Sequence, residues 1–256
     1  MLREASLPLL AVMLAACPTK QNGDKPDTGE AIEVGPQTRP PGTADEEGET
    51  PSTRAHMQDH FSKADEIKAA LIAGKLEQAR EPARWMAEHQ ADVDHPDAWK
   101  PYVQSMREAA QRIGGAKDLA AATRAFVELA EVCAACHTAL GGPKIDVGEP
   151  PKPSESDDLA AHMARHQWAL DAMWQGLMGP SKDAWIVGAE ALAEAPLAPG
   201  ALAPDQSVPK EIEQLAARVH ALGNEARDVP DVSGIPGRVY AELLTTCETC
   251  HAALRR

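Results

Sequence analysis

The 256-residue chain carries two copies of one segment, and this internal duplication limits its possible folds more than any other feature. Ala-His-Met-x-x-His occurs at 55–60 and again at 161–166, which is 106 residues later. Cys-x-x-Cys-His occurs at 133–137 and at 247–251, which is 114 residues later. The second copy is therefore about eight residues longer, and the proline-rich stretch 195–209 most easily holds the difference. We expect one architecture built twice.

The apolar residues of each copy predict helices. Met57, His60 and Ala64 begin a stripe whose members lie three and four residues apart, and Met163 and His166 begin its counterpart. Such a stripe is typical of the buried face of a helix in a bundle. Sustained alternation, which would indicate strands, does not occur in the sequence. Four helices with short loops in each copy predict an all-α chain of two tandem antiparallel four-helix bundles.

Glycine and proline indicate where these helices end. Gly74 and the pair Gly179-Pro180 should end the first helix of each copy. A third helix is expected from Asp97 to Gly114-Gly115, with a counterpart around 206–228.

Composition divides the chain into five segments. Residues 1–16 have the pattern of a signal peptide and are excluded from the fold. Residues 17–54 are rich in Pro, Gly, Thr, Asp and Glu, which predicts a disordered tether. Residues 142–156 have a similar composition and are interpreted as a linker. The two folded units are then 55–141 and 157–256.

Cys17 ends a Leu-Ala-Ala-Cys stretch that follows a short apolar run. The stretch resembles a bacterial lipoprotein signal in which Cys17 receives the lipid; an ordinary cleaved signal peptide is the alternative. The apolar run is too short for a transmembrane helix. Pro18 stands where an aspartate holds lipoproteins at the inner membrane, which favours the periplasmic side of the outer membrane.

The Cys-x-x-Cys-His spacing is the attachment pattern of c-type haem. Cysteines three residues apart share a helix face, and the histidine that follows them can bind iron. A zinc site would need further ligands beside each string, and a redox dithiol would need a βαβ context. Four of the five cysteines lie in the two strings, so with Cys17 lipidated none remains for a disulfide. The sequence predicts two haem c groups per chain.

A helical unit with this string near its C-terminus resembles the class II cytochromes c, the family that includes cytochrome c′. The resemblance covers both folded units and implies a duplicated, lipid-anchored, dihaem form. It implies haem thioethers at Cys133, Cys136, Cys247 and Cys250, with His137 and His251 as proximal iron ligands. The family often has a basic residue shortly after the proximal histidine; Arg255 fits in the second copy, whereas Gly141 does not in the first.

The sixth iron ligand is open between three possibilities. His60 and His166 lie on the apolar stripe, where a buried imidazole needs a partner that iron would supply. Met57 and Met163 lie on the same stripe and would ligate through sulfur. The third possibility is that neither type of residue binds iron and that the methionines only fill the core.

The other histidines are weaker candidates. His56 and His162 lie beside the stripe. His89, His95 and His220 have no counterpart in the other copy, so we expect them at the surface.

Charge and motif content restrict the function. The formal net charge is −14, which argues against nucleic acid as a partner. The acidic surface suits a basic redox partner protein through electrostatic steering, or only aids solubility. The expected function is electron transfer at the cell envelope, and a gas-binding cytochrome c′-like protein is the alternative. No cluster of acid–base residues indicates an enzyme, and the sequence leaves the oligomeric state open.

Overall fold

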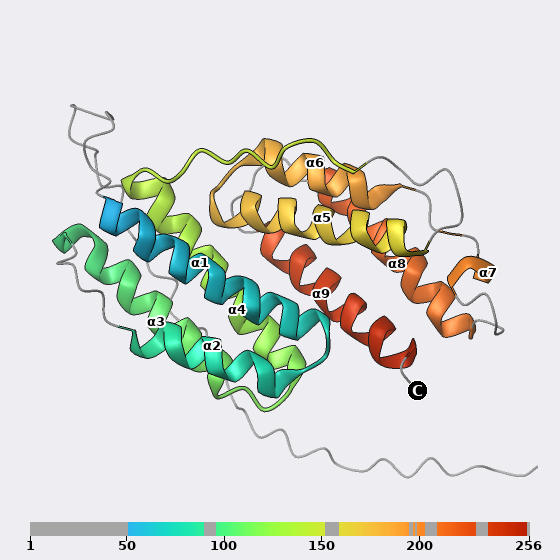
Figure 1. Cartoon of the computed structure of the whole chain (residues 1–256), viewed down its shortest axis with the longest axis horizontal. Coiled ribbons are helices and arrows are strands. Elements are labelled where there is room, and N and C mark those ends of the chain that lie inside the picture. The colour runs from blue at the N-terminus through green and yellow to red at the C-terminus, as the bar shows by residue number, and fades with distance from the viewer. Residues whose placement is uncertain are drawn as a thin grey trace, which may run out of the picture. The chain divides into compact units, whose positions relative to one another are not determined.

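The computed structural model describes residues 51–89, 96–151, 159–194, 197, 199–202, 209–228 and 235–254 (Figure 1). Within these ranges every regular element is a helix, which confirms the all-α prediction. The described residues all belong to a single compact unit. No helix among them is long and apolar enough to cross a membrane. The signal peptide and Cys17 lie outside the described residues, as does most of the predicted tether.

The helices follow the two copies. The first copy holds α1 (Pro51–Ile72), α2 (Leu76–Glu88), the 3-10 turn η1 (Asp97–Trp99), α3 (Lys100–Gly114) and α4 (Leu119–Leu140). The second holds α5 (Leu159–Met178), α6 (Lys182–Ala193), the short α7 (Pro199–Leu202), α8 (Lys210–Arg227) and α9 (Ile235–Leu254). The helix α1 thus begins inside the stretch predicted as a tether. The predicted linker contributes residues 142–151, which contain no helix.

Successive helices pack against one another in both copies. In the first copy α1 packs on α2, α2 on α3 and α3 on α4; in the second α5 packs on α6, α6 on α8 and α8 on α9. The first and last helix of one copy touch each other less than they touch the other copy. The main contacts between the copies are α4 with α9, α4 with α5, and α1 with α9. The two copies therefore meet through their first and last helices.

The predicted end of the first helix is confirmed in both copies. Gly74 has φ 66°, and its N–H bonds to Leu71 O while the N–H of Lys75 bonds to Ala70 O. This pair of bonds is a Schellman motif, which favours glycine because the left-handed conformation disfavours a Cβ. The motif does not use the carbonyl of Ile72, the last residue of α1. In the second copy α5 ends at Met178, directly before Gly179.

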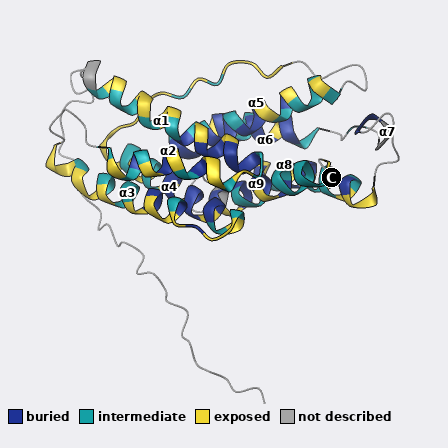
Figure 2. Ribbon diagram, turned by 60° about the horizontal axis from the view of Figure 1, so that its bottom comes forward, coloured by how far each residue is buried: buried dark blue, intermediate teal, exposed yellow. Residues whose placement is uncertain are grey.

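Buried residues form one cluster that runs through both copies and includes the region where they meet (Figure 2, dark blue). Phe126 of α4 stacks on Trp174 of α5 at 4.4 Å between ring centroids, and Trp174 lies 5.9 Å from Tyr240 of α9. Phe126 and Tyr240 are equivalent residues, each seven positions before the first cysteine of its string. All three rings are fully buried. These three aromatic side chains thus pack between the copies, where their large apolar area contributes to stability.

Candidate functional site

The two Cys-x-x-Cys-His strings occupy equivalent places near the C-terminal ends of α4 and α9. All four of their cysteines are free thiols. Cys133 and Cys247 pack against the hydrophobic core, and burial raises the pKa of each to about 12. Burial also raises the pKa of Cys136 and Cys250. The thiols are therefore protonated and uncommitted at neutral pH.

Each string histidine is held by the opposite copy. The Nδ1 of His137 lies 2.8 Å from the carbonyl oxygen of Met178, the last residue of α5. The Nδ1 of His251 lies 3.2 Å from the carbonyl oxygen of Ile72, the last residue of α1. A carbonyl only accepts, so Nδ1 carries a proton in both rings, and in the neutral form of each imidazole the lone pair is then on Nε2. Ile72 and Met178 are equivalent residues, so the two bonds are reciprocal.

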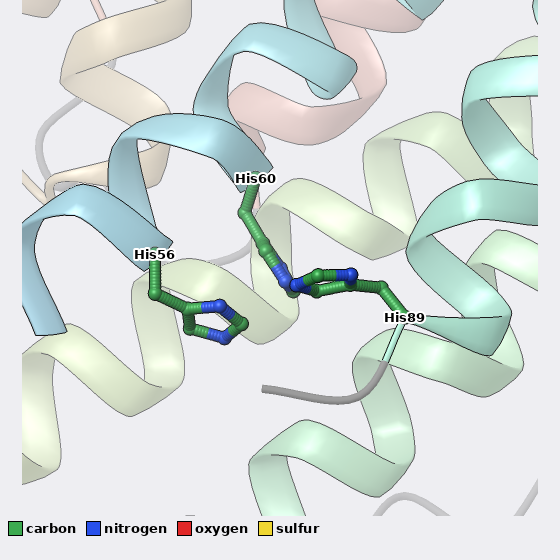
Figure 3. A group of neighbouring side chains, drawn as sticks. All are labelled: His56, His60 and His89. Atoms are coloured by element: carbon green, nitrogen blue, oxygen red, sulfur yellow. The ribbon is translucent and has the colours of Figure 1, made fainter. Parts of the chain in front are cut away.

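Two further groups of imidazoles lie in the fold. The first histidine cluster consists of His56 and His60 of α1 and of His89, which follows α2 (Figure 3). The second histidine cluster consists of His162 and His166 of α5 and of His220 of α8. In each cluster three ring nitrogens, one from each histidine, lie within 4.8 Å of one another. Both clusters combine the duplicated His-x-x-x-His pair with a histidine that only one copy has.

The first histidine cluster is half-buried and rests on two neighbouring side chains. His60 Nδ1 lies 3.1 Å from the sulfur of Met106, a residue of α3. His89 stacks on Trp85 at 4.0 Å between ring centroids, and His56 lies 4.3 Å from His60 by the same measure.

The second histidine cluster is more enclosed. His220 is 5% exposed, and its Nδ1 lies 2.8 Å from the carbonyl oxygen of Leu192. The Nε2 atoms of His166 and His220 are buried and have no hydrogen-bond partner in the described part of the chain. Because the Nδ1 of His220 donates to Leu192, the Nε2 of His220 is an acceptor in need of a partner, while the Nε2 of His166 is a buried polar atom whose role as donor or acceptor no contact fixes.

Burial lowers the pKa of His166 to about 3, and nearby positive groups act in the same direction. Arg165 is one of those groups, and the others are His162, His220 and the string histidine His251 in their protonated forms. Burial lowers the pKa of His162 and His220 as well. At neutral pH the second cluster is a group of neutral imidazoles close enough to His251, in the Cys-x-x-Cys-His string of its own copy, to interact with it electrostatically.

The histidines without a counterpart in the other copy are placed differently from the prediction. The surface prediction for His220 is wrong, because α8 directs this residue between α5 and the end of α6. His89 is half-buried rather than exposed, since it stacks on Trp85. His95 lies outside the described residues. A sequence signal existed for His220: it lies eight residues after Ile212 and three before Gly223, so it shares a helix face with two residues that are also buried.

The remaining candidates are placed less decisively. Met57 of α1 and Met163 of α5 are half-buried. The thioether nearest His60 belongs instead to Met106, a residue that the sequence analysis did not single out. Gly141 follows α4 with φ 84°, and Arg255 lies beyond the described residues.

Comparisons with known proteins return nothing: no family model, no curated protein and no solved structure matches this chain.

Proposed function

We propose that this chain is a dihaem c-type cytochrome that carries electrons at the bacterial cell envelope. In this proposal each copy is a four-helix bundle resembling the class II cytochromes c, with one haem attached to its last helix. The observation that carries the proposal is the state of the two string histidines. Each donates Nδ1–H to a helix-terminal carbonyl, which fixes the tautomer and leaves Nε2 for iron.

The surrounding residues fit haem c. Two free thiols three residues apart lie on one face of α4, at Cys133 and Cys136, and the same pair recurs on α9 at Cys247 and Cys250. When bound, haem supplies the Fe(III)/Fe(II) couple. The carbonyl that accepts the hydrogen bond from each proximal imidazole would make that ring a stronger electron donor to iron. This would favour the ferric state and lower the reduction potential.

His60 and His166 are the proposed sixth ligands. They occupy equivalent positions on the first helix of each copy, and the charge of His251 influences the pKa of His166. The buried Nε2 of His166 has no hydrogen-bond partner among the described residues, and a bond to iron would supply one. Ligation by Met57 and Met163 is the alternative. If His137 and His60 in the first copy, and His251 and His166 in the second, held haem iron, the group would supply a low-spin couple, which suits an electron carrier.

The location is also proposed from sequence alone. Lipid on Cys17 would anchor the chain to the periplasmic side of the outer membrane, and the following segment would let the folded part reach its partners. The net charge of −14 would steer basic redox proteins towards it.

The test begins with the native exported protein. Mass spectrometry should find two covalent haems, and the absorption spectrum should be low-spin and unchanged by carbon monoxide. His60→Ala and His166→Ala should each turn one haem high-spin, whereas the matched variants Met57→Leu and Met163→Leu should not. A single haem or none would refute the dihaem proposal. A high-spin ferrous form that binds carbon monoxide would replace electron transfer with gas binding.

A further inference from the structure

The second histidine cluster offers more imidazoles than a haem iron can use. After the proximal histidine binds, iron has one axial position left, and His166 is the residue proposed for it. His162 lies one turn before His166 on α5, and His220 reaches the same point from α8. Their rings lie close together: His162 and His166 are 4.2 Å apart between centroids, and His166 and His220 are 5.0 Å apart.

His220 has the environment of a metal ligand. Its Nδ1–H donates to the carbonyl of Leu192, so its Nε2 carries the lone pair. That nitrogen is buried without a hydrogen-bond partner among the described residues, in a side chain that is about 95% enclosed. Leaving a buried acceptor unsatisfied destabilises the fold, and a metal ion would remove that cost. A histidine whose second nitrogen bonds to a backbone carbonyl is the usual arrangement around a bound metal.

The cluster also suits a particular class of ion. Three neutral nitrogen ligands without a thiolate favour Zn²⁺ and its neighbours in the first transition row. Zn–N bonds of about 2.0–2.1 Å place tetrahedral ligand atoms about 3.3 Å apart. The ring nitrogens, now within 4.8 Å, would reach that spacing through small side-chain rotations. Glu194 acts electrostatically on His162 and His220, and its carboxylate is paired with Arg165, so these two opposite charges largely offset each other beside the cluster.

We propose that His162, His166 and His220 bind one divalent transition-metal ion of the zinc class in the chain before haem is attached. Binding of this ion does not depend on the proposed cytochrome function. Only its timing does, because His166 cannot bind the ion and the haem iron together.

The first histidine cluster provides an internal comparison. There His60 Nδ1 contacts the sulfur of Met106, and the third ring, that of His89, is held by stacking on Trp85. No described hydrogen bond to a backbone carbonyl orients His89 as Leu192 orients His220, and all three histidines are half-buried. We therefore expect the first cluster to bind the same ion more weakly.

The experiment is a titration with Co²⁺, whose ligand-field absorption reports its coordination. The full chain is used with all five cysteines replaced by alanine, which removes both haem attachment and thiolate ligands. One tight equivalent of Co²⁺ should bind. His220→Ala should weaken it by at least about 100-fold, since even outer-shell changes cost 10–100-fold. His89→Ala, the matched change in the first cluster, should leave the tight equivalent in place.

Two further measurements keep the outcome decisive. Far-UV circular dichroism checks that His220→Ala folds, and His162→Ala, at a less enclosed position, serves if it does not. Zn²⁺ should raise the Tm of the parent chain and not that of either variant. Absence of a tight equivalent, or an equivalent that survives both substitutions, would overturn the proposal.

The same Co²⁺ titration of the haem-loaded exported protein distinguishes the metal-site proposal from the proposed cytochrome function. If iron holds His166, Co²⁺ should find no His220-dependent site there. A His220-dependent site in the loaded protein would preserve the cluster and remove His166 from the iron. Absence of haem in the exported protein would refute the cytochrome and leave the Co²⁺ result unaffected.

Discussion

Lys68 provides the sharpest test of how the two copies are held together. Its side chain is 4% exposed, and its Nζ lies 2.8 Å from Asp65 Oδ1 of the same helix and 2.6 Å from Asp171 Oδ1 of α5. The ammonium also lies 5.9 Å from the centroid of the Trp174 ring. The double change Asp65→Asn and Asp171→Asn leaves this buried charge without a counter-charge.

Removing the partner of a buried charge costs about 3–5 kcal/mol when the pair is fully enclosed. Here the two carboxylates are 41% and 39% exposed, so water already screens part of the attraction. We therefore expect the double variant to lose about 2–3 kcal/mol of unfolding free energy. Adding Lys68→Met should recover most of this loss, because Met has a similar length and no charge to bury.

Urea unfolding followed by far-UV circular dichroism measures the effect, with an unchanged m value as the check that the same surface is exposed. Asp97→Asn is the control, because the Lys100–Asp97 pair is 68% and 92% exposed and should contribute less than about 0.5 kcal/mol. A loss below about 1 kcal/mol in the double variant would contradict the reasoning. So would a triple variant no more stable than the double.

Two predictions concern ionisation in the haem-free chain. Burial holds the pKa of Cys133 and Cys247 at about 12, so iodoacetamide should alkylate these thiols more slowly at pH 8 than Cys136 and Cys250. Unfolding in urea should make the four alkylation rates equal. Equal rates in the folded chain would contradict the burial. His166, whose pKa burial lowers to about 3, stays neutral in the fold, whereas the unfolded imidazole binds a proton below about pH 6.5. The unfolding free energy should therefore fall as pH drops from 6.5 towards 3, by up to about 1.4 kcal/mol per pH unit. Urea titrations at pH 7 and pH 5 measure this dependence, and His166→Leu should make it smaller.

The sequence predicted the helices well because their determinants are local. The stripe beginning at Met57 predicted α1, and Gly74 predicted its end, since a left-handed residue there needs glycine. The region from Asp97 to Gly114 was expected to be helical and is η1 followed by α3.

Contacts between the copies were not predictable in this way. The acceptors for His137 and His251 are backbone carbonyls, which any residue provides, so no residue type marks them. The prediction placed His220 at the surface because it relied on residues that match between the copies. The first copy has no histidine that corresponds to His220 of α8. What positions His220 is the packing of α8 on α6, which brings the ring to Leu192 and to His166 of α5 and is a property of the three-dimensional packing.

The reciprocal bonds from the string histidines have a consequence for the gene. Each imidazole takes its orientation from a peptide group encoded in the other half of the reading frame. Deleting one half would leave the survivor's ring free to rotate, even with every residue of its own half intact. A gene shortened to one half would therefore encode a string histidine without the acceptor that orients it.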